Sequence, residues 1–536
     1  MNNEISSLED IRIIRNDNSE ENRDNPHKDT LEMKISTWMM LYANLETSEY
    51  RAKMRDVCIS IAEALRKENI IVADHGSFSS KFASSSPYHY FLTLINVLQD
   101  THSQIFSVSF HEIIDYTLGE IVDSLHLCND VELSWIVTEY MLAAQDPKMT
   151  IICDACVDFQ IEYELPFDII LTVMEGSSYR FHNSKVSILK YYNDKIRIIV
   201  SNADMRHIQW KSQTQGIWVS PLLPLLPDIT DPSDGESITN FKNDFIDYLS
   251  QYEQPEVFGW IALVQRADCS AINVAFIASV PGYHDNLSLN KWGYNKLETV
   301  LANHVTTSPN SQNWPIIAHS SCLGVYGNNY DYWLANIVKA MSNEKNSSDI
   351  KPDIKIIYPS QKNVNESIYD KSNTKLFHCK DTYLQELWMS DYMYQWKSEK
   401  TCRSLAMPQL RCYTRISPDE TEISWFLLTS CNLTKSSWGK LLDNERGLKI
   451  SNYEAGVLFL PKIVIKQTSF PIKETNSLEI PVFLLPYDVP LTKYEPDDNP
   501  FFTSDPNFVV STESIRKRIN TESNDIKDFF TQFLSK

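Results

Sequence analysis

The most informative polar residues of the chain stand two apart, just before an apolar run. Asn183 and Lys185 precede the run 196–200, and Asn202 lies just beyond its end. In an extended segment residues two apart share a face, so the amide of Asn183 and the ammonium of Lys185 point the same way. The side-chain amide of Asn202 can donate to an anionic oxygen. Together these groups make half of a phosphate-binding site.

The same pattern recurs in the second half of the chain. Gln409 and Arg411 precede the apolar run 423–428, and Asn432 lies just beyond it. The guanidinium of Arg411 is suited to bidentate contact with a phosphate. A single copy would be better explained as strand-edge polar groups that face water. Because the pattern occurs twice, we interpret the two copies as one phosphodiester site at a domain junction.

A nucleophile is missing from both copies. Amides neither attack phosphorus usefully nor take up a proton near neutral pH, and no histidine follows His378. One candidate nucleophile is His182, which a β-bulge could turn toward the site. The alternative places His182 on the opposite face of the strand, with Val186 and Ile188, as a hydrogen-bonded core histidine.

Composition limits the class of protein. A chain of 536 residues predicts two or more domains, and a net charge of −21 argues against a protein that coats nucleic acid by bulk attraction. We expect no membrane span and no signal peptide, because no long apolar run occurs. The ten cysteines are expected to be reduced thiols. Cys153 and Cys156 form a lone CxxC, which is a weak zinc signal.

The order of apolar segments indicates an α/β fold. We expect residues 1–30 to form a disordered acidic tail and residues 31–86 to form a helical extension and linker. An amphipathic helix is expected over 241–252. Strands and helices then alternate, which is typical of a sheet covered on both faces. The expected strands are 196–200, 272–278, 354–358, 423–428 and 455–460, and the expected helices include 37–67, 297–304 and 384–396.

Many short motifs resemble the tyrosyl-DNA phosphodiesterase family of the phospholipase D superfamily. The similarity extends, in order, from about Tyr88 to Phe502. Its signatures are Thr214-Gln215-Gly216-Ile217-Trp218, Ser220-Pro221, Gly235-Glu236-Ser237, Ala406-Met407-Pro408, Ser417-Pro418-Asp419, Thr429 through Leu433, Trp438-Gly439, Tyr453-Glu454 and Pro486-Tyr487-Asp488.

The resemblance implies a fold of two similar phospholipase D-like domains, each a mixed β-sheet between helices, with the site at their interface. We expect these domains to span 87–265 and 266–536. In the family one histidine attacks the 3′ phosphorus and forms a phosphohistidine. A second histidine protonates the leaving group and then activates water. No metal and no cofactor are implied.

Several residues can be assigned roles from the family, position by position. Lys185, Asn202 and Asn432 match its phosphate ligands, and Arg411 replaces a lysine. Gln215 and Glu454 stand where the family orients its histidines, and Ser320 and Ser321 fall in a loop that contacts DNA phosphates. Phe501 stands near an aromatic residue that stacks on a base. Asn183 and Gln409 stand at the positions of the two histidines.

Three functions fit these residues. The first is a nuclear DNA-repair phosphodiesterase that removes 3′ adducts, including topoisomerase peptides, from single-stranded or duplex DNA. The second is a weak or inactive member that binds and protects 3′ ends, and the third is an interaction scaffold. The basic stretch 397–415 is a candidate path for single-stranded DNA. Retention of the phosphate ligands speaks against the scaffold. We expect a monomer with no membrane partner.

Overall fold

The computed structural model of the chain describes residues 34, 48–157, 168–174, 181–227, 231, 233–305, 314–324, 326, 333–342, 353–368, 387–442, 447–474 and 480–501. The predicted acidic tail, residues 1–30, lies outside the described residues. Among those described, no helix has the length and apolar character that a bilayer crossing requires.

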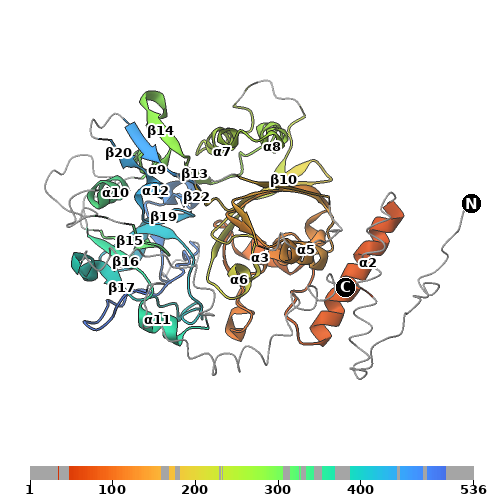
Figure 1. Ribbon diagram of the computed structural model, residues 1–536, viewed down its shortest axis with the longest axis horizontal. Helices are drawn as coiled ribbons and strands as arrows, with labels where there is room; N and C mark the ends of the chain where they lie inside the picture. The colour runs from red at the N-terminus through yellow and green to blue at the C-terminus, as the bar shows by residue number, and fades with distance from the viewer. Residues whose placement is uncertain are drawn as a thin grey trace, which may run out of the picture.

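A mixed sheet forms the centre of the N-terminal half (Figure 1). Within the described ranges its order is β2-β1-β11-β10-β9-β3-β5-β7, with β12 paired to β10. Its strands are β1 (Tyr90–Thr93), β2 (Ser107–Val108), β3 (Ile121–Leu127), β5 (Lys148–Cys153), β7 (Ile169–Val173), β9 (Val186–Tyr191), β10 (Lys195–Ser201), β11 (Gly216–Val219) and β12 (Leu223–Pro224). β10 contains the predicted strand 196–200 and is buried on both faces, as expected for a central strand.

Helices cover the face of this sheet that turns away from the C-terminal half (Figure 1). They are α2 (Ser48–Lys67), α3 (Ser77–Ser84), α4 (Phe110–Ile113), α5 (Leu133–Leu142) and α6 (His207–Lys211). Ile61 of α2 and Tyr140 of α5 share one buried cluster with Leu189 of β9. The serine-rich stretch that follows α2 forms α3, and Phe78 of that helix is fully buried against Phe91.

A second mixed sheet forms the centre of the C-terminal half (Figure 1). Its order within the described residues is β13-β22-β19-β18-β15-β16-β17, and β23 and β8 join at its sides. The strands are β8 (Phe181–His182), β13 (Val274–Ser279), β15 (Ile316–His319), β16 (Ile354–Ile357), β17 (Met393–Tyr394), β18 (Cys412–Ile416), β19 (Glu422–Thr429), β22 (Asn452–Phe459) and β23 (Phe470–Pro471). A smaller sheet joins β14 (Gly282–Asp285), β21 (Gly447–Ile450) and β20 (Lys440–Leu441).

Helices also pack on the second sheet. They are α7 (Phe241–Leu249), α9 (Gly293–His304), α10 (Trp333–Ser342), α11 (Gln361–Glu366), α12 (Lys435–Trp438) and α13 (Pro461–Val464). Helix α8 (Pro255–Gln265) packs on α7 and lies over β10 of the first sheet (Figure 1). The rings of Phe241 and Phe245 in α7 lie 5.5 and 5.1 Å from that of Phe276 in β13. The amphipathic helix predicted at 241 is therefore confirmed, although α7 packs on the second sheet and the predicted domain limits stay a prediction.

One predicted helix is wrong. Of the range 384–396, residues 387–392 form a short 3-10 helix, and β17 follows with Met393 and Tyr394. Met393 pairs with Ile356, and Tyr394 pairs with Ile357, in parallel with β16. Strand pairing at the edge of the sheet outweighs the local helical pattern here, which a single sequence does not reveal.

The two halves approach so closely that one position has room only for glycine. A Cβ added at Gly216 of β11 would lie 2.5 Å from Leu428 Cδ1 and 2.7 Å from Leu410 Cδ1. Both leucines belong to the C-terminal half, so Gly216 lets the backbone of one half contact the side chains of the other. This contact lies beside the candidate site, because the same Cβ would lie 3.2 Å from Asn202 Oδ1.

A buried arginine connects the two halves. Arg403 is fully buried, and its Nη2 donates to Thr93 O at 2.9 Å and to Ser107 Oγ at 2.8 Å. Its Nη1 donates to Gln104 Oε1 at 2.6 Å. All three acceptors belong to the N-terminal half. Loss of the guanidinium would leave several buried acceptors without a donor.

We predict that Arg403→Met lowers the free energy of unfolding by about 3 kcal/mol, because charge-assisted bonds between the halves are lost. Urea denaturation of the full chain measures the change. Lys400→Met is the matched control, since Lys400 is exposed, and it should change the free energy by less than about 0.5 kcal/mol. Equal effects of the two substitutions would contradict the role of Arg403.

Candidate functional site

The N-terminal half-site (Asn183, Lys185 and Asn202) is held on the C-terminal sheet. β8 pairs in parallel with β22, with His182 opposite Tyr453. The backbone N–H of Asn183 donates to Tyr453 O at 2.9 Å. Asn183–Lys185 thus lie in the link between β8 and β9, not inside a strand. The chain therefore places the first copy of the motif directly against the second half.

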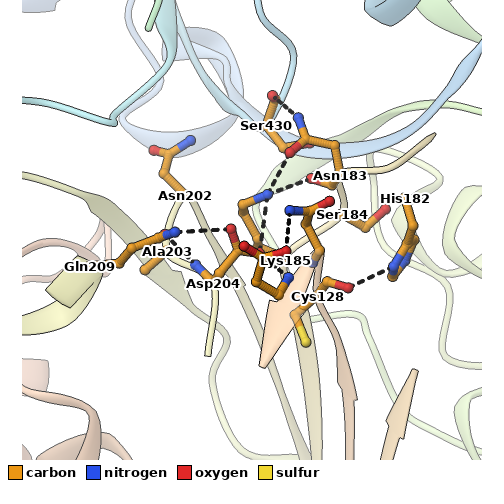
Figure 2. A network of polar contacts seen from close by, with 12 residues as sticks. Cys128, His182, Asn183, Ser184, Lys185, Asn202, Ala203, Asp204, Gln209 and Ser430 are labelled. Atoms are coloured by element: carbon orange, nitrogen blue, oxygen red, sulfur yellow. Dashed lines mark hydrogen bonds and ion pairs between the residues drawn. The ribbon is translucent and has the colours of Figure 1, made fainter. Parts of the chain in front are cut away.

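Asn183 contacts two residues of the C-terminal half. Its Nδ2 donates to Glu454 Oε2 at 2.8 Å and to Ser430 O at 3.0 Å, and Figure 2 shows Asn183 turned toward Ser430. Glu454 is fully buried and accepts three further bonds, from Ser430 Oγ, Ser437 Oγ and Asn452 Nδ2. Burial raises the pKa of Glu454. Its position beside Asn183 fits the predicted orienting role.

The ammonium of Lys185 is surrounded by acceptors. Its Nζ donates to Asn183 Oδ1 at 2.7 Å and to Asn183 O at 2.9 Å. The carboxylate of Asp204 lies 3.4 Å from the same nitrogen. Figure 2 shows Lys185 between these two residues. Two of its three N–H groups therefore bond to Asn183, and the nearby carboxylate of Asp204 balances its charge.

The C-terminal half-site (Gln409, Arg411 and Asn432) has donors that remain available. Asn432 Oδ1 accepts from Arg411 Nε and Cys322 N at 3.0 Å, from Ser321 Oγ at 3.1 Å and from Ser320 Oγ at 3.2 Å. These four donors fix the amide, and its Nδ2 has no hydrogen bond to any described residue. Arg411 Nη1 is buried and also lacks a partner. Ser320 and Ser321 therefore position Asn432 and Arg411.

Asn202, a predicted phosphate ligand, and Gln215, a predicted orienting residue, are arranged differently from the expectation. Asn202 Nδ2 donates to Thr429 O at 2.5 Å, and its Oδ1 is buried without a partner. The donor of Asn202 thus joins the two halves, and in this conformation it is not free for a phosphate. Gln215 is fully buried, and its Nε2 lies 3.5 Å from Gln213 Oε1. Within the described residues Gln215 bonds to neither half-site amide.

Gln409 lies at the junction without a side-chain partner. Its backbone N–H donates to Thr214 O at 3.1 Å, which joins it to the N-terminal half. Its side chain is 5% exposed and makes no hydrogen bond to the described part of the chain. Because an amide cannot act as a base near neutral pH, this position supplies no proton-transfer group.

His182 is a core histidine, and the hypothesis that a bulge brings it into the site is wrong. Its Nδ1 donates to Cys128 O at 2.7 Å, and its Nε2 accepts from Tyr252 OH at 2.7 Å. Figure 2 shows its ring turned away from Lys185, toward Cys128. Burial lowers the pKa of His182 to about 3. The alternation of faces explains this placement, because Ser184 also points this way, toward Tyr248 OH.

Two further expectations about DNA contacts are corrected. The ring of Phe501 is fully buried in the core, so it presents no face to a base. In the basic stretch 397–415, Arg403 and Arg415 are buried and donate to carbonyl oxygens. Arg403 joins the two halves, Arg415 bonds within the C-terminal half, and of the cations in the stretch only Lys397 and Lys400 are exposed.

Asp204 is the functional candidate that the sequence analysis missed. It lies two residues after Asn202, so the periodicity of an extended segment could have identified it as a neighbour of the site. A cavity of about 280 Å³ lies elsewhere, between the segment 71–81 and the helices α4, α5 and α6, and is lined by Lys81, His111, Glu139 and Lys211 among others. None of the predicted site residues lines it.

We predict that His182 makes stability depend on pH. The unfolded chain protonates histidine near pH 6.5, whereas folded His182 resists protonation down to about pH 3. Stability therefore falls as the pH decreases below about 6.5. Between pH 7 and pH 5 the wild type should lose about 2 kcal/mol more than His182→Gln, measured by urea denaturation. Parallel pH curves would show that His182 is not a buried neutral group.

Comparison with known proteins agrees with this geometry. The family model described as tyrosyl-DNA phosphodiesterase matches residues 89–495. Tyrosyl-DNA phosphodiesterase 1 of Drosophila melanogaster is 36% identical over 454 residues, which cover 82% of this chain and 78% of the relative. That of Arabidopsis thaliana is 30% identical over 387 residues, 69% of this chain and 62% of the relative.

The fold is shared with a solved structure. The crystal structure of the yeast tyrosyl-DNA phosphodiesterase matches with a TM-score of 0.60 at 17% identity, over 78% of this chain and 100% of that one. The predicted α/β fold of two phospholipase D-like domains is thereby confirmed. The extent of the family match and the identity to the insect protein settle the assignment: this chain belongs to the tyrosyl-DNA phosphodiesterase family of the phospholipase D superfamily.

Proposed function

We propose that this protein acts in DNA repair on blocked 3′ ends and holds the terminal phosphodiester between its two half-sites. The observation that carries the proposal is the contact of Asn183 with Glu454 and Ser430, which joins the two copies of the motif into one site. The available donors, Asn432 Nδ2 and Arg411 Nη1, suit the non-bridging oxygens of a phosphate. The family and its relatives support DNA as the substrate.

Hydrolysis at this site is expected to be slow. General acid–base assistance is typically worth about 10²–10⁴-fold, and the amides of Asn183 and Gln409 cannot supply it. Glu454 does not replace them as a base, because four donors already occupy its oxygens. The remaining contribution is positioning and electrostatic stabilisation of the phosphate.

The proposal extends to partners and place of action. The 3′ adducts would include tyrosyl peptides left by a topoisomerase, on single-stranded or duplex DNA, and the protein would work in the nucleus as a monomer. A protein that binds and protects such ends without turnover is the second candidate. The absence of both imidazoles, with the orienting carboxylate of Glu454 still present, favours it.

We predict that the wild type binds a single-stranded oligonucleotide with a 3′-phosphotyrosine about tenfold more tightly than the same oligonucleotide with a 3′-hydroxyl. The reason is the charge-assisted contact of Arg411 with the phosphate. Fluorescence anisotropy measures both affinities, and gel electrophoresis of the same samples detects cleavage. Equal affinity for the two ends, without cleavage, would contradict the proposed function.

Restoring the imidazoles should raise turnover. We predict that Asn183→His combined with Gln409→His increases cleavage of the 3′-phosphotyrosyl oligonucleotide by at least about 10²-fold, because nucleophile and acid return together. Glu454 Oε2 lies 2.8 Å from the side-chain nitrogen at position 183, so it can orient the new ring. The single variants serve as controls and should gain much less, since the two groups act as a unit. No gain in the double variant would show that the site is not built for this reaction.

A further inference from the structure

A buried ion pair occupies the N-terminal half-site. The side chains of Lys185 and Asp204 are 1% and 6% exposed, and their charged atoms lie 3.4 Å apart. Lys185 is the residue that would contact a phosphate oxygen under the proposed function. Its charge is already balanced by a carboxylate of the protein.

The carboxylate of Asp204 is fixed by the surrounding chain. The backbone N–H of Asn129 donates to its Oδ1 at 2.8 Å, and Gln209 Nε2 donates to its Oδ2 at 3.1 Å. Gln209 also accepts from the backbone N–H of Asp204 at 2.7 Å, and Figure 2 shows the two residues side by side. The backbone N–H of Asp130 adds a longer bond to Oδ1 at 3.4 Å, so four bonds hold Asp204 in place before any ligand arrives.

This arrangement makes the two half-sites unequal. A carboxylate oxygen has the charge and the acceptor capacity of a phosphate oxygen. Asn183 takes two of the three N–H groups of Lys185, and the carboxylate of Asp204 balances its charge. In the C-terminal half-site, by contrast, Arg411 Nη1 is buried and bonds to no described residue, and no described residue accepts from Asn432 Nδ2.

We propose that Asp204 is an internal counter-anion that sets the affinity of the site for a phosphodiester. The phosphate binds through Arg411 and Asn432, and Lys185 contributes only when Asp204 no longer neutralises it. This inference rests on the proposed function and adds to it a residue that determines affinity. Asp204 acts through Lys185, so it is a positioning residue and not a catalytic one.

The test compares affinities of the full chain for the single-stranded 3′-phosphotyrosyl oligonucleotide by fluorescence anisotropy. Asp204→Asn keeps the size of the side chain and removes its charge, so binding should tighten about tenfold, as expected for a close charge pair. Asp244→Asn is the matched control. Asp244 pairs with Lys296 at 2.7 Å and has no hydrogen bond or ion pair with a half-site residue in the described part of the chain, so its loss should change affinity less than about twofold.

The same substitution in a protein that lacks Lys185 shows whether the increase in affinity depends on that residue. In Asp204→Asn combined with Lys185→Met the gain should disappear, because the released ammonium is gone. A purely structural role of Asp204 would weaken binding and would not produce a gain. If Asp204→Asn does not fold, Asp204→Ser serves for the same comparison, since its hydroxyl can accept from Asn129.

The outcomes separate the two proposals. Tighter binding by Asp204→Asn that depends on Lys185 supports the inference, including the case in which only the variant binds. Binding by the wild type with no gain in Asp204→Asn, or a gain of equal size in Asp244→Asn, overturns the inference and leaves the proposed function intact. Absence of binding by both the wild type and the variant overturns both.

Discussion

The buried carboxylate of Glu454 is the group on which the arrangement of the site depends. A buried charge requires hydrogen-bond donors, and four side chains supply them. Three of these come from the C-terminal half, and the fourth is Asn183, which the pairing of β8 with β22 brings across from the N-terminal half. One ionisable group thus joins both copies of the motif at a single place.

Pairing of a cation with a carboxylate inside the protein limits the positive potential at the site. Lys185 is paired with Asp204, and the whole chain carries a net charge of −21. Bulk attraction to DNA is therefore weak. Recognition of a 3′ end would depend on a few hydrogen-bond donors, above all those of Arg411 and Asn432. Four hydrogen bonds to Asn432 Oδ1 fix the position of these side chains.

Much of this could be predicted from local patterns. The alternation of faces separates Asn183 and Lys185 from His182 and Ser184, and the structure shows that separation. The apolar runs identify the central strands, and the repeat of the motif indicates a junction between two halves. These features depend only on residues close in sequence or on internal repetition.

The rest depends on contacts between distant segments. The ion pair of Lys185 with Asp204 and the burial of Phe501 arise from contacts within a half, and the bond from Asn202 to Thr429 and the burial of Arg403 arise from packing between the halves. A cation in the sequence looks the same whether it faces DNA or a buried carbonyl. The short strand β17 was missed for the same reason, since only its partner β16 makes it a strand.

The most direct measurement is a crystal structure of the protein with a single-stranded oligonucleotide that ends in a 3′-phosphotyrosine. The account predicts the terminal phosphorus at the junction of the halves, with its oxygens within hydrogen-bond reach of Arg411 and Asn432 and beside Asn183. A 3′ end bound elsewhere on the protein, with Arg411 and Asn432 in contact only with other protein groups, would contradict the claim that the two half-sites form one site.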